Sequence, residues 1–179
     1  TVAHADDWRP LRDTAIQTGQ LAGPDDCWLT LRGLRTMGAR QERQAASALV
    51  LALWLQDRPE VARVLHPALP SCPGHEYWKR DFSGASSLFG VVFDPAFTEA
   101  DMTAMIDGLA LFGIGASWGG YESLVLPTTG SIARSCPSIT HGGVACRLHI
   151  GLEAPEALAA DLARGLDGMS AARHLRGKC

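Results

Sequence analysis

The residue types most suggestive of chemistry lie in segment 144–150, which reads Val-Ala-Cys-Arg-Leu-His-Ile. Side chains alternate across a β-strand, so an extended segment places Ala145, Arg147 and His149 on one face. A mid-strand arginine among apolar residues is expected to be partly buried, and a buried guanidinium without a partner is costly. The pattern therefore predicts an anionic partner for Arg147. It is either a carboxylate of the protein or a ligand carboxylate held by two parallel hydrogen bonds.

A second candidate is the glycine-rich segment 113–124, in which four glycines fall within residues 113–120. Glycine lets the backbone approach a ligand or another chain closely, and Ser117 and Trp118 would be exposed within this stretch. Such a pattern is also typical of simple tight turns. It does not match a phosphate-binding loop, because no lysine follows at the required spacing.

The remaining candidates do not form a complete active site. No serine lies in a Gly-x-Ser-x-Gly elbow, and the cysteines carry no catalytic signature. The histidines lack the spacing of metal ligands; they are His4, His66, His75, His141, His149 and His174. We therefore expect neither a catalytic residue nor a metal ligand in this chain.

Helices are expected at four places. Residues 7–19 have apolar residues at helical spacing and Gly19 as a stop, and residues 25–57 read as one long or kinked helix. Thr98 is a natural N-cap for a helix whose apolar stripe includes Met102, Met105, Ile106 and Leu109. Pro155 suits the first turn of a last helix, in which Leu158, Leu162 and Leu166 would be buried.

Extended segments are expected at 61–66, 87–93, 122–126 and 144–150, and the proline-rich stretch 67–74 is expected to be irregular. Single strands alternate with helices, and several connections are short. The predicted fold class is α/β, with helices on one face of a small mixed or mostly antiparallel sheet.

The composition is that of a globular protein, with 46% hydrophobic and 20% charged residues. A net charge of −3 gives no electrostatic reason to expect nucleic acid or a membrane surface as a partner, and no apolar run approaches membrane-spanning length. The five cysteines are an odd number without Cys-x-x-Cys spacing, which favours a reducing cytoplasm. Lysine occurs only at Lys79 and Lys178, and the first helical pattern starts almost at once, so we expect a piece of a longer protein.

Several strings resemble the transsulfuration (Cys/Met metabolism) family of pyridoxal-phosphate (PLP) enzymes. They keep the family's order over nearly the whole chain and read LRGLRT at 31–36, HPALP at 66–70, GHE at 74–76, WKRDFSG at 78–84, SWGGYESL at 117–124 and RLHIGLE at 147–153. Tryptophan after Ser117 resembles the bacterial cystathionine β-lyase branch, because γ-lyases and γ-synthases usually have leucine there.

This resemblance implies the C-terminal domain of the aspartate-aminotransferase-like fold (fold type I). Residues 1–40 would be the tail of the large PLP-binding domain with a linking helix, and residues 41–179 the small domain. The implied reaction is β-elimination from L-cystathionine to homocysteine, pyruvate and ammonia. The cofactor, pyridoxal 5'-phosphate, would be bound covalently by a lysine in a segment absent from this chain, since Lys79 matches a different family position.

Residue by residue, the resemblance assigns the substrate α-carboxylate to Arg147 and the lining of the same pocket to Ser117 and Trp118. It assigns no catalytic or cofactor-binding residue to this chain, and nothing to the loop 127–143. The implied partners are an amino-acid substrate, the PLP-binding N-terminal half and further copies in a homotetramer. The alternatives are a non-catalytic assembly or binding module, and a γ-type transsulfuration enzyme.

Overall fold

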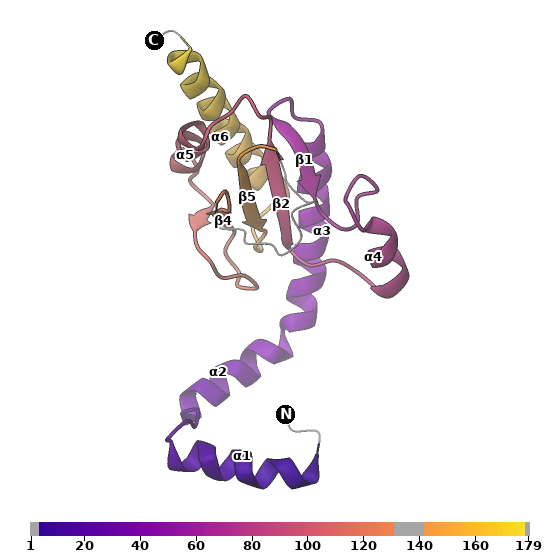
Figure 1. Ribbon diagram of the computed structural model, residues 1–179, viewed down its shortest axis with the longest axis vertical. Helices are drawn as coiled ribbons and strands as arrows, with labels where there is room; N and C mark the ends of the chain where they lie inside the picture. Colours follow the sequence, from indigo (N-terminus) through magenta and orange to yellow (C-terminus); the bar gives the residue numbers. More distant parts are fainter. Residues whose placement is uncertain (1–3, 131–141, 178–179) are drawn as a thin grey trace. The chain divides into compact units, whose positions relative to one another are not determined.

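The computed structural model describes residues 4–130 and 142–177. The chain divides into two compact units, Thr1–Gly38 and Ala39–Cys179. The first unit contains helices α1 (Ala5–Gln17) and α2 (Pro24–Arg35), and helix α3 (Met37–Gln56) begins at its end (Figure 1). Within the part of the chain that the structure describes, no helix is both long and apolar enough to cross a bilayer.

Local sequence sets the ends of the first helices. Helix α1 stops as predicted near Gly19, whose φ of +69° favours glycine and whose N–H donates to the Ile16 carbonyl. Helix α2 starts at Pro24, where a missing N–H costs nothing. The long or kinked helix predicted for 25–57 is interrupted at Thr36, whose dihedral angles are not helical, so the segment forms two successive helices. Glycines on both sides of this break, Gly33 and Gly38, weaken the helix there.

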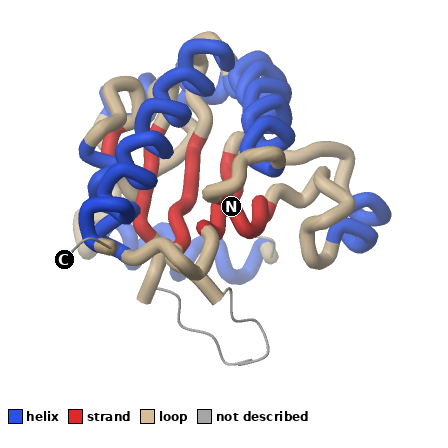
Figure 2. Tube along the Cα trace, turned by 90° about the horizontal axis from the view of Figure 1, so that it is seen from above, coloured by secondary structure: helices blue, strands red, loops and turns tan. Residues whose placement is uncertain are grey.

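The second unit contains one five-stranded sheet with the strand order β1-β2-β5-β4-β3. The strands are β1 (Val61–Leu65), β2 (Leu88–Phe93), β3 (Gly113–Ile114), β4 (Leu124–Pro127) and β5 (Ala145–His149) (Figure 2). All neighbours are antiparallel except β3 and β4, so the sheet is mixed and mostly antiparallel, as the sequence predicts.

The register separates the sheet into two faces. Residues directly opposite each other in antiparallel strands point to the same side. Cys146 is opposite Val91, which is opposite Val64, and all three are in the core. The next residue along β5, Arg147, therefore points to the other face, as the alternation in the sequence predicts. Burial raises the pKa of the Cys146 thiol to about 12, so this cysteine is a core residue rather than a nucleophile.

Three helices cover the core face: α3, α5 (Glu99–Asp107) and α6 (Pro155–Arg176), which run alongside the strands in Figures 1 and 2. Thr98 caps α5 together with Asp101, and Pro155 opens α6, both as predicted. The helices bury an apolar stripe that includes Ala48, Leu51, Ala52, Leu55, Met102, Met105, Ile106, Leu158, Leu162, Leu166 and Met169.

Helix α4 (His75–Asp81) is an element that periodicity does not predict. It contains no buried residue, so no apolar stripe marks it in the sequence. It begins after Gly74, which has a φ of +85°, and the His75 ring lies 2.8 Å from the Pro67 carbonyl oxygen. Most of the loop 127–143, to which the sequence assigns nothing, lies outside the described residues.

Candidate functional site

Arg147 lies in the middle of β5, on the face of the sheet opposite the helices. Its Nη2 atom donates to carbonyl oxygens of the glycine-rich loop that joins β3 to β4. The distances are 3.4 Å to Gly115, 2.9 Å to Ala116 and 3.2 Å to Ser117. The guanidinium is therefore fixed on one side by the backbone of the loop.

The edge of the Arg147 guanidinium formed by Nε and Nη2 has unused hydrogen-bonding capacity at Nε. Its Nε is buried and has no hydrogen-bond partner among the residues that the structure describes. Among residues 4–130 and 142–177, no carboxylate forms an ion pair with Arg147. Burying a charged donor without a hydrogen-bond partner costs free energy. The Nε side of the guanidinium therefore favours the binding of an anion.

Trp118 lies beside Arg147, with the guanidinium carbon 5.6 Å from the centre of its ring. This distance is within cation–π range, so the indole helps to hold the guanidinium in place. The ring is nevertheless 60% exposed, and the Ser117 side chain is exposed next to it. The structure thus brings together all three residues singled out by the sequence: Arg147, Ser117 and Trp118.

Two buried polar side chains hold the residues that follow Trp118. The N–H of Gly119 donates to Nε2 of His149 over 3.2 Å, and Nε2 of Gln44 in α3 donates to the Gly120 carbonyl over 2.6 Å. Gly119 has a φ of +82°, a conformation that a side chain would strain. The turn after Trp118 is therefore fixed from the sheet and from a helix.

The contacts of His149 define its tautomer. Its Nε2 accepts the Gly119 N–H, so in the neutral ring the proton is on Nδ1. Nδ1 lies 2.7 Å from the Ser87 hydroxyl oxygen and donates to it. Both His149 and Ser87 are buried, so the pair orients the imidazole with its acceptor toward the loop.

Burial is the largest influence on the pKa of His149 and lowers it from its ordinary value. The positive charge of Arg147 also lowers this pKa, whereas the backbone of Gly120 and the carboxylates of Glu153 and Glu122 raise it. The net direction is downward, so His149 is neutral at pH 7 and can accept the hydrogen bond from the loop.

The far end of the loop is fixed by Glu153. Its carboxylate oxygens accept the Ser123 N–H and the Ser123 hydroxyl, each over 2.9 Å, and the Ser123 oxygen accepts the Gly151 N–H over 2.8 Å. A Cβ at Gly151 would lie 2.3 Å from the Tyr121 carbonyl oxygen. Glycine is therefore required where the end of β5 passes under the loop.

Sequence reasoning did not assign a role to Gln44, Ser87 or Glu153. Gln44 is a polar residue beside an apolar helical stripe, and nothing in its sequence neighbourhood indicates its burial or its bond to the loop. Glu153 belongs to the string 147–153 that supported the family resemblance, so a signal existed for it. The hydrogen bonds of Gln44 and Ser87 bridge 76 and 62 positions of the sequence, which no local pattern can indicate.

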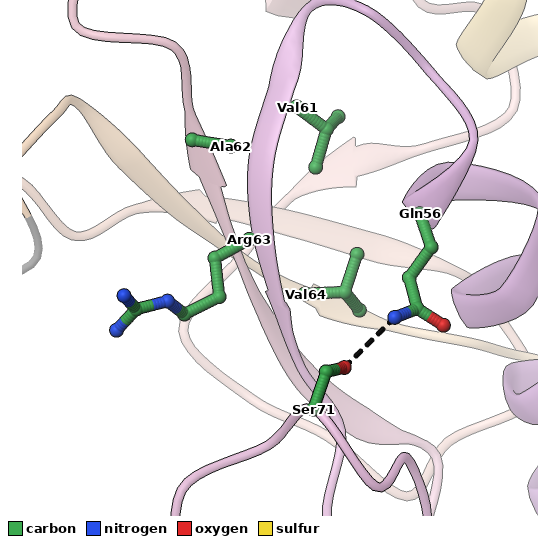
Figure 3. Close-up of a pocket in the computed structure, with 6 residues that line it drawn as sticks. All are labelled: Gln56, Val61, Ala62, Arg63, Val64 and Ser71. Carbon is green, nitrogen blue, oxygen red and sulfur yellow. Dashed lines mark hydrogen bonds between the residues drawn. The ribbon is translucent and has the colours of Figure 1, made fainter.

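Two cavities lie away from this site. One of about 170 Å³ lies along the edge strand β1, where Gln56 donates to Ser71 and the Arg63 side chain extends outward (Figure 3). The other, of about 320 Å³, is lined by Glu60, Arg173 and neighbouring residues. None of Arg147, Ser117 and Trp118 lines either cavity, so neither belongs to the candidate site.

Comparisons with known proteins identify the family to which the chain belongs. Residues 2–167 match the family model described as Cys/Met metabolism PLP-dependent enzyme. Cystathionine beta-lyase of Salmonella typhimurium is 45% identical over 92% of this chain and 42% of that protein. Cystathionine beta-lyase MetC of Escherichia coli is 44% identical over the same shares. The chain thus spans about two fifths of the length of these curated relatives.

A solved structure shows the same fold. The apo form of CalE6, a methionine gamma lyase from Micromonospora echinospora, superposes with a TM-score of 0.75 at 34% identity. The superposition covers 94% of this chain and 43% of that chain. The predicted fold class, a C-terminal part of the fold-type-I PLP enzymes, is confirmed, and so is the family resemblance.

Proposed function

The chain belongs to the Cys/Met metabolism PLP-dependent enzymes, and from this premise we propose that it is the C-terminal portion of a carbon–sulfur β-lyase. The proposed reaction is β-elimination from L-cystathionine to homocysteine, pyruvate and ammonia. The similarity to two bacterial cystathionine beta-lyases, each over 92% of this chain, supports this choice of reaction.

The observation that carries the proposal is the Arg147 guanidinium, with its buried Nε free beside Trp118. A substrate α-carboxylate can take Nε and Nη2 as a two-pronged pair, and its oxygen would then replace the loop carbonyls at Nη2. Two parallel hydrogen bonds fix orientation as well as position. In this proposal Arg147 binds the substrate and sets the direction of its Cα–H bond.

Ser117 and Trp118 line the same place. Both side chains are exposed beside the guanidinium, so they can contact the part of a substrate that extends from its carboxylate. Trp118 offers an apolar face of the kind that packs against a thioether chain. We assign the binding of the substrate chain to these two residues and no proton transfer to either.

The residues described here do not fit a complete PLP site. A PLP enzyme needs a lysine for the covalent bond to the cofactor, which supplies an electron sink for the reaction. Lys79 is exposed on α4, and Lys178 lies outside the described residues. We therefore propose that a segment outside this chain binds PLP, and we derive no step through the cofactor.

The wider assignments are proposals of the same kind. Residues 1–40 would be the tail of a PLP-binding domain with a linking helix, and residues 41–179 a small domain. The division of the chain into two compact units near residue 38 supports this boundary. The proposed partners are a PLP-binding N-terminal half and further copies in a tetramer, and the proposed compartment is the cytoplasm.

Two alternatives compete with β-elimination. The similarity to a methionine gamma lyase favours a γ-type reaction, although Trp118 resembles the β-lyase branch. A non-catalytic assembly module would use the same fold without chemistry. Arg147 speaks against the second alternative, because an assembly module has no need for a buried guanidinium nitrogen without a partner.

The test is to join the chain to a PLP-binding segment of a curated relative and to add L-cystathionine. Release of pyruvate would support β-elimination, whereas release of 2-oxobutyrate would replace it with a γ-type reaction. PLP absorbance without turnover would favour the assembly module. The chain without the added segment is the control and should show neither absorbance nor product.

A further inference from the structure

Two residues on the same face of strand β5 hold the loop around Trp118. Arg147 holds the carbonyl groups before Trp118, and His149, the next residue on that face of β5, holds the N–H of Gly119 after it. Trp118 therefore lies between two fixed points while its own ring stays exposed. The direction of the indole depends on both contacts.

The His149 contact needs a particular chemical state of the ring. Gly119 offers a donor, so Nε2 must be an acceptor, and the Ser87 hydroxyl fixes this state by accepting the Nδ1 proton. His149 has 0% exposure, so water does not compete for Nε2. A buried side chain this specifically satisfied is suited to holding a backbone group in place.

We propose that His149 is a positioning residue, whose Nε2 acceptor fixes Gly119 and thereby orients the Trp118 ring against Arg147. An effect of the Trp118 orientation on catalysis rests on the proposed function, because Trp118 contacts a substrate only if Arg147 binds the substrate carboxylate. The step from His149 to the orientation of Trp118 rests on the described contacts alone.

The charges around His149 make this contact sensitive to pH. Arg147 faces the ring from its own strand, Glu122 from the loop and Glu153 from the segment after β5, and Gly120 faces it through its backbone. A proton on Nε2 would oppose the Gly119 N–H with another donor. The hydrogen bond from the Gly119 N–H is therefore lost when His149 is protonated at acid pH.

Two substitutions separate the two nitrogens of the ring. In His149→Gln the amide oxygen reaches the place of Nε2 and can still accept the Gly119 N–H. In His149→Asn the shorter side chain can only reach the place of Nδ1, near Ser87. Ser123→Ala is the matched control, since Ser123 has the same 0% exposure and lies in the same loop but hydrogen-bonds at its far end.

The experiment uses the whole chain and measures amide hydrogen exchange at Gly119 and the fluorine signal of 5-fluorotryptophan at Trp118. His149→Asn should speed exchange at Gly119 roughly tenfold and broaden or shift the Trp118 signal, whereas His149→Gln should stay near the wild type. Ser123→Ala should speed exchange at Gly151 instead. Equal effects of Asn and Gln at Gly119 would overturn the proposal.

One measurement uses the wild-type chain, so it can be made even if a variant fails to fold. Nitrogen chemical shifts of His149 in the wild-type chain report the tautomer directly. A proton on Nδ1 at pH 7 supports the proposal, and a proton on Nε2 overturns it.

The enzymatic step is tested in the chain joined to a PLP-binding segment. His149→Asn should lower kcat/KM for L-cystathionine about tenfold, and His149→Gln should restore most of the loss. Equal kcat/KM for both variants would refute an effect of His149 on catalysis. If the joined enzyme cleaves no cystathionine while the exchange and tautomer results hold, the proposed function fails and the positioning of Trp118 by His149 stands.

Discussion

Arg147 and His149 are alternate residues of one strand that hold the same loop in opposite ways. Arg147 donates to the loop backbone through Nη2 and has no partner at Nε among the described residues, whereas His149 accepts from the loop and has both nitrogens occupied. The sequence indicates that Arg147 needs a partner, because a charged residue in an apolar strand is unusual. It cannot indicate that carbonyl groups of the loop would accept hydrogen bonds from Nη2 of Arg147.

Replacing Arg147 tests the proposed binding of the carboxylate. In the joined enzyme, Arg147→Ala should lower kcat/KM by about thirtyfold to several thousandfold, because truncating one partner of a buried charged pair costs roughly 2–5 kcal/mol. Arg147→Lys keeps the charge but loses the two-pronged geometry, so it should recover only part of the loss. Steady-state kinetics with L-cystathionine measures both.

The cofactor absorbance of the same variants is the control. It should hardly change, because in the proposed enzyme another segment binds PLP. Near-normal kcat/KM in Arg147→Ala would refute the carboxylate role and leave Arg147 as a residue that only anchors the loop.

Acid should destabilise the fold through His66 and His149, both of which are buried. Burial lowers the pKa of both His66 and His149, so the folded state resists protonation that the unfolded chain accepts below about pH 6.5. The stabilisation is present above the unfolded value and is lost as pH falls through the lower folded value. The free energy of unfolding by urea should therefore decrease between pH 7.5 and about pH 5.

A substitution isolates the contribution of His149 to this pH dependence. His149→Gln should flatten the dependence of the free energy of unfolding on pH. An unchanged slope in His149→Gln would show that His149 is not among the groups responsible.

At the scale of elements, the sequence predicts the helices and strands whose apolar residues recur at a regular spacing. Helices α1, α2, α3, α5 and α6 and strands β1, β2, β4 and β5 have apolar stripes or runs and are predicted. Helix α4, without a buried residue, and the two-residue strand β3 have none and are missed. The site residues fall into the same two groups. Arg147, Ser117 and Trp118 can be predicted from the local sequence, whereas Gln44 and Ser87 reach the site only through the tertiary fold.

Because the chain after β5 passes close to the backbone of the loop at Gly151, we expect a side chain at this position to destabilise the fold. Gly151→Ala would place a Cβ 2.3 Å from the Tyr121 carbonyl oxygen and 2.6 Å from the Glu122 carbonyl carbon. Both are backbone atoms, which cannot rotate away, so we expect a loss of roughly 2–3 kcal/mol in the free energy of unfolding. Gly84→Ala is the control, because nothing lies within 4 Å of a Cβ there. Similar losses in both variants would refute the steric account.

At the scale of the whole molecule, the first unit has too little core for its apolar content. Helices α1 and α2, both described in full, contain no buried residue. Their exposed apolar residues include Trp8, Leu11, Ile16, Trp28, Leu29, Leu31 and Leu34. Contiguous exposed apolar surface usually indicates a partner, and the proposed PLP-binding domain would supply one.

The isolated chain should therefore self-associate at micromolar concentration, as measured by sedimentation velocity. Replacing Leu31 and Leu34 of α2 with glutamate should shift the chain toward monomer. Val50→Glu, at a position 55% exposed on α3, should not. A stable wild-type monomer would contradict the expectation.

The isolated chain should also fail to bind PLP covalently. After incubation with PLP and reduction with borohydride, peptide mapping should find no stoichiometric pyridoxyl adduct at Lys79. A curated relative that includes its PLP-binding segment is the positive control. A stoichiometric adduct at Lys79 would mean that the cofactor site is complete in this chain.

The two faces of the sheet have a consequence for mutational scanning. Cys146 and Leu148 point into the core, whereas Arg147 and His149 point to the loop. Substitutions along β5 should therefore give an odd–even pattern. Even positions would mainly lower the abundance of the protein in cells, and odd positions would lower growth that depends on its activity more than they lower abundance. A single library scored in both ways would thus report the register of this strand without a structure.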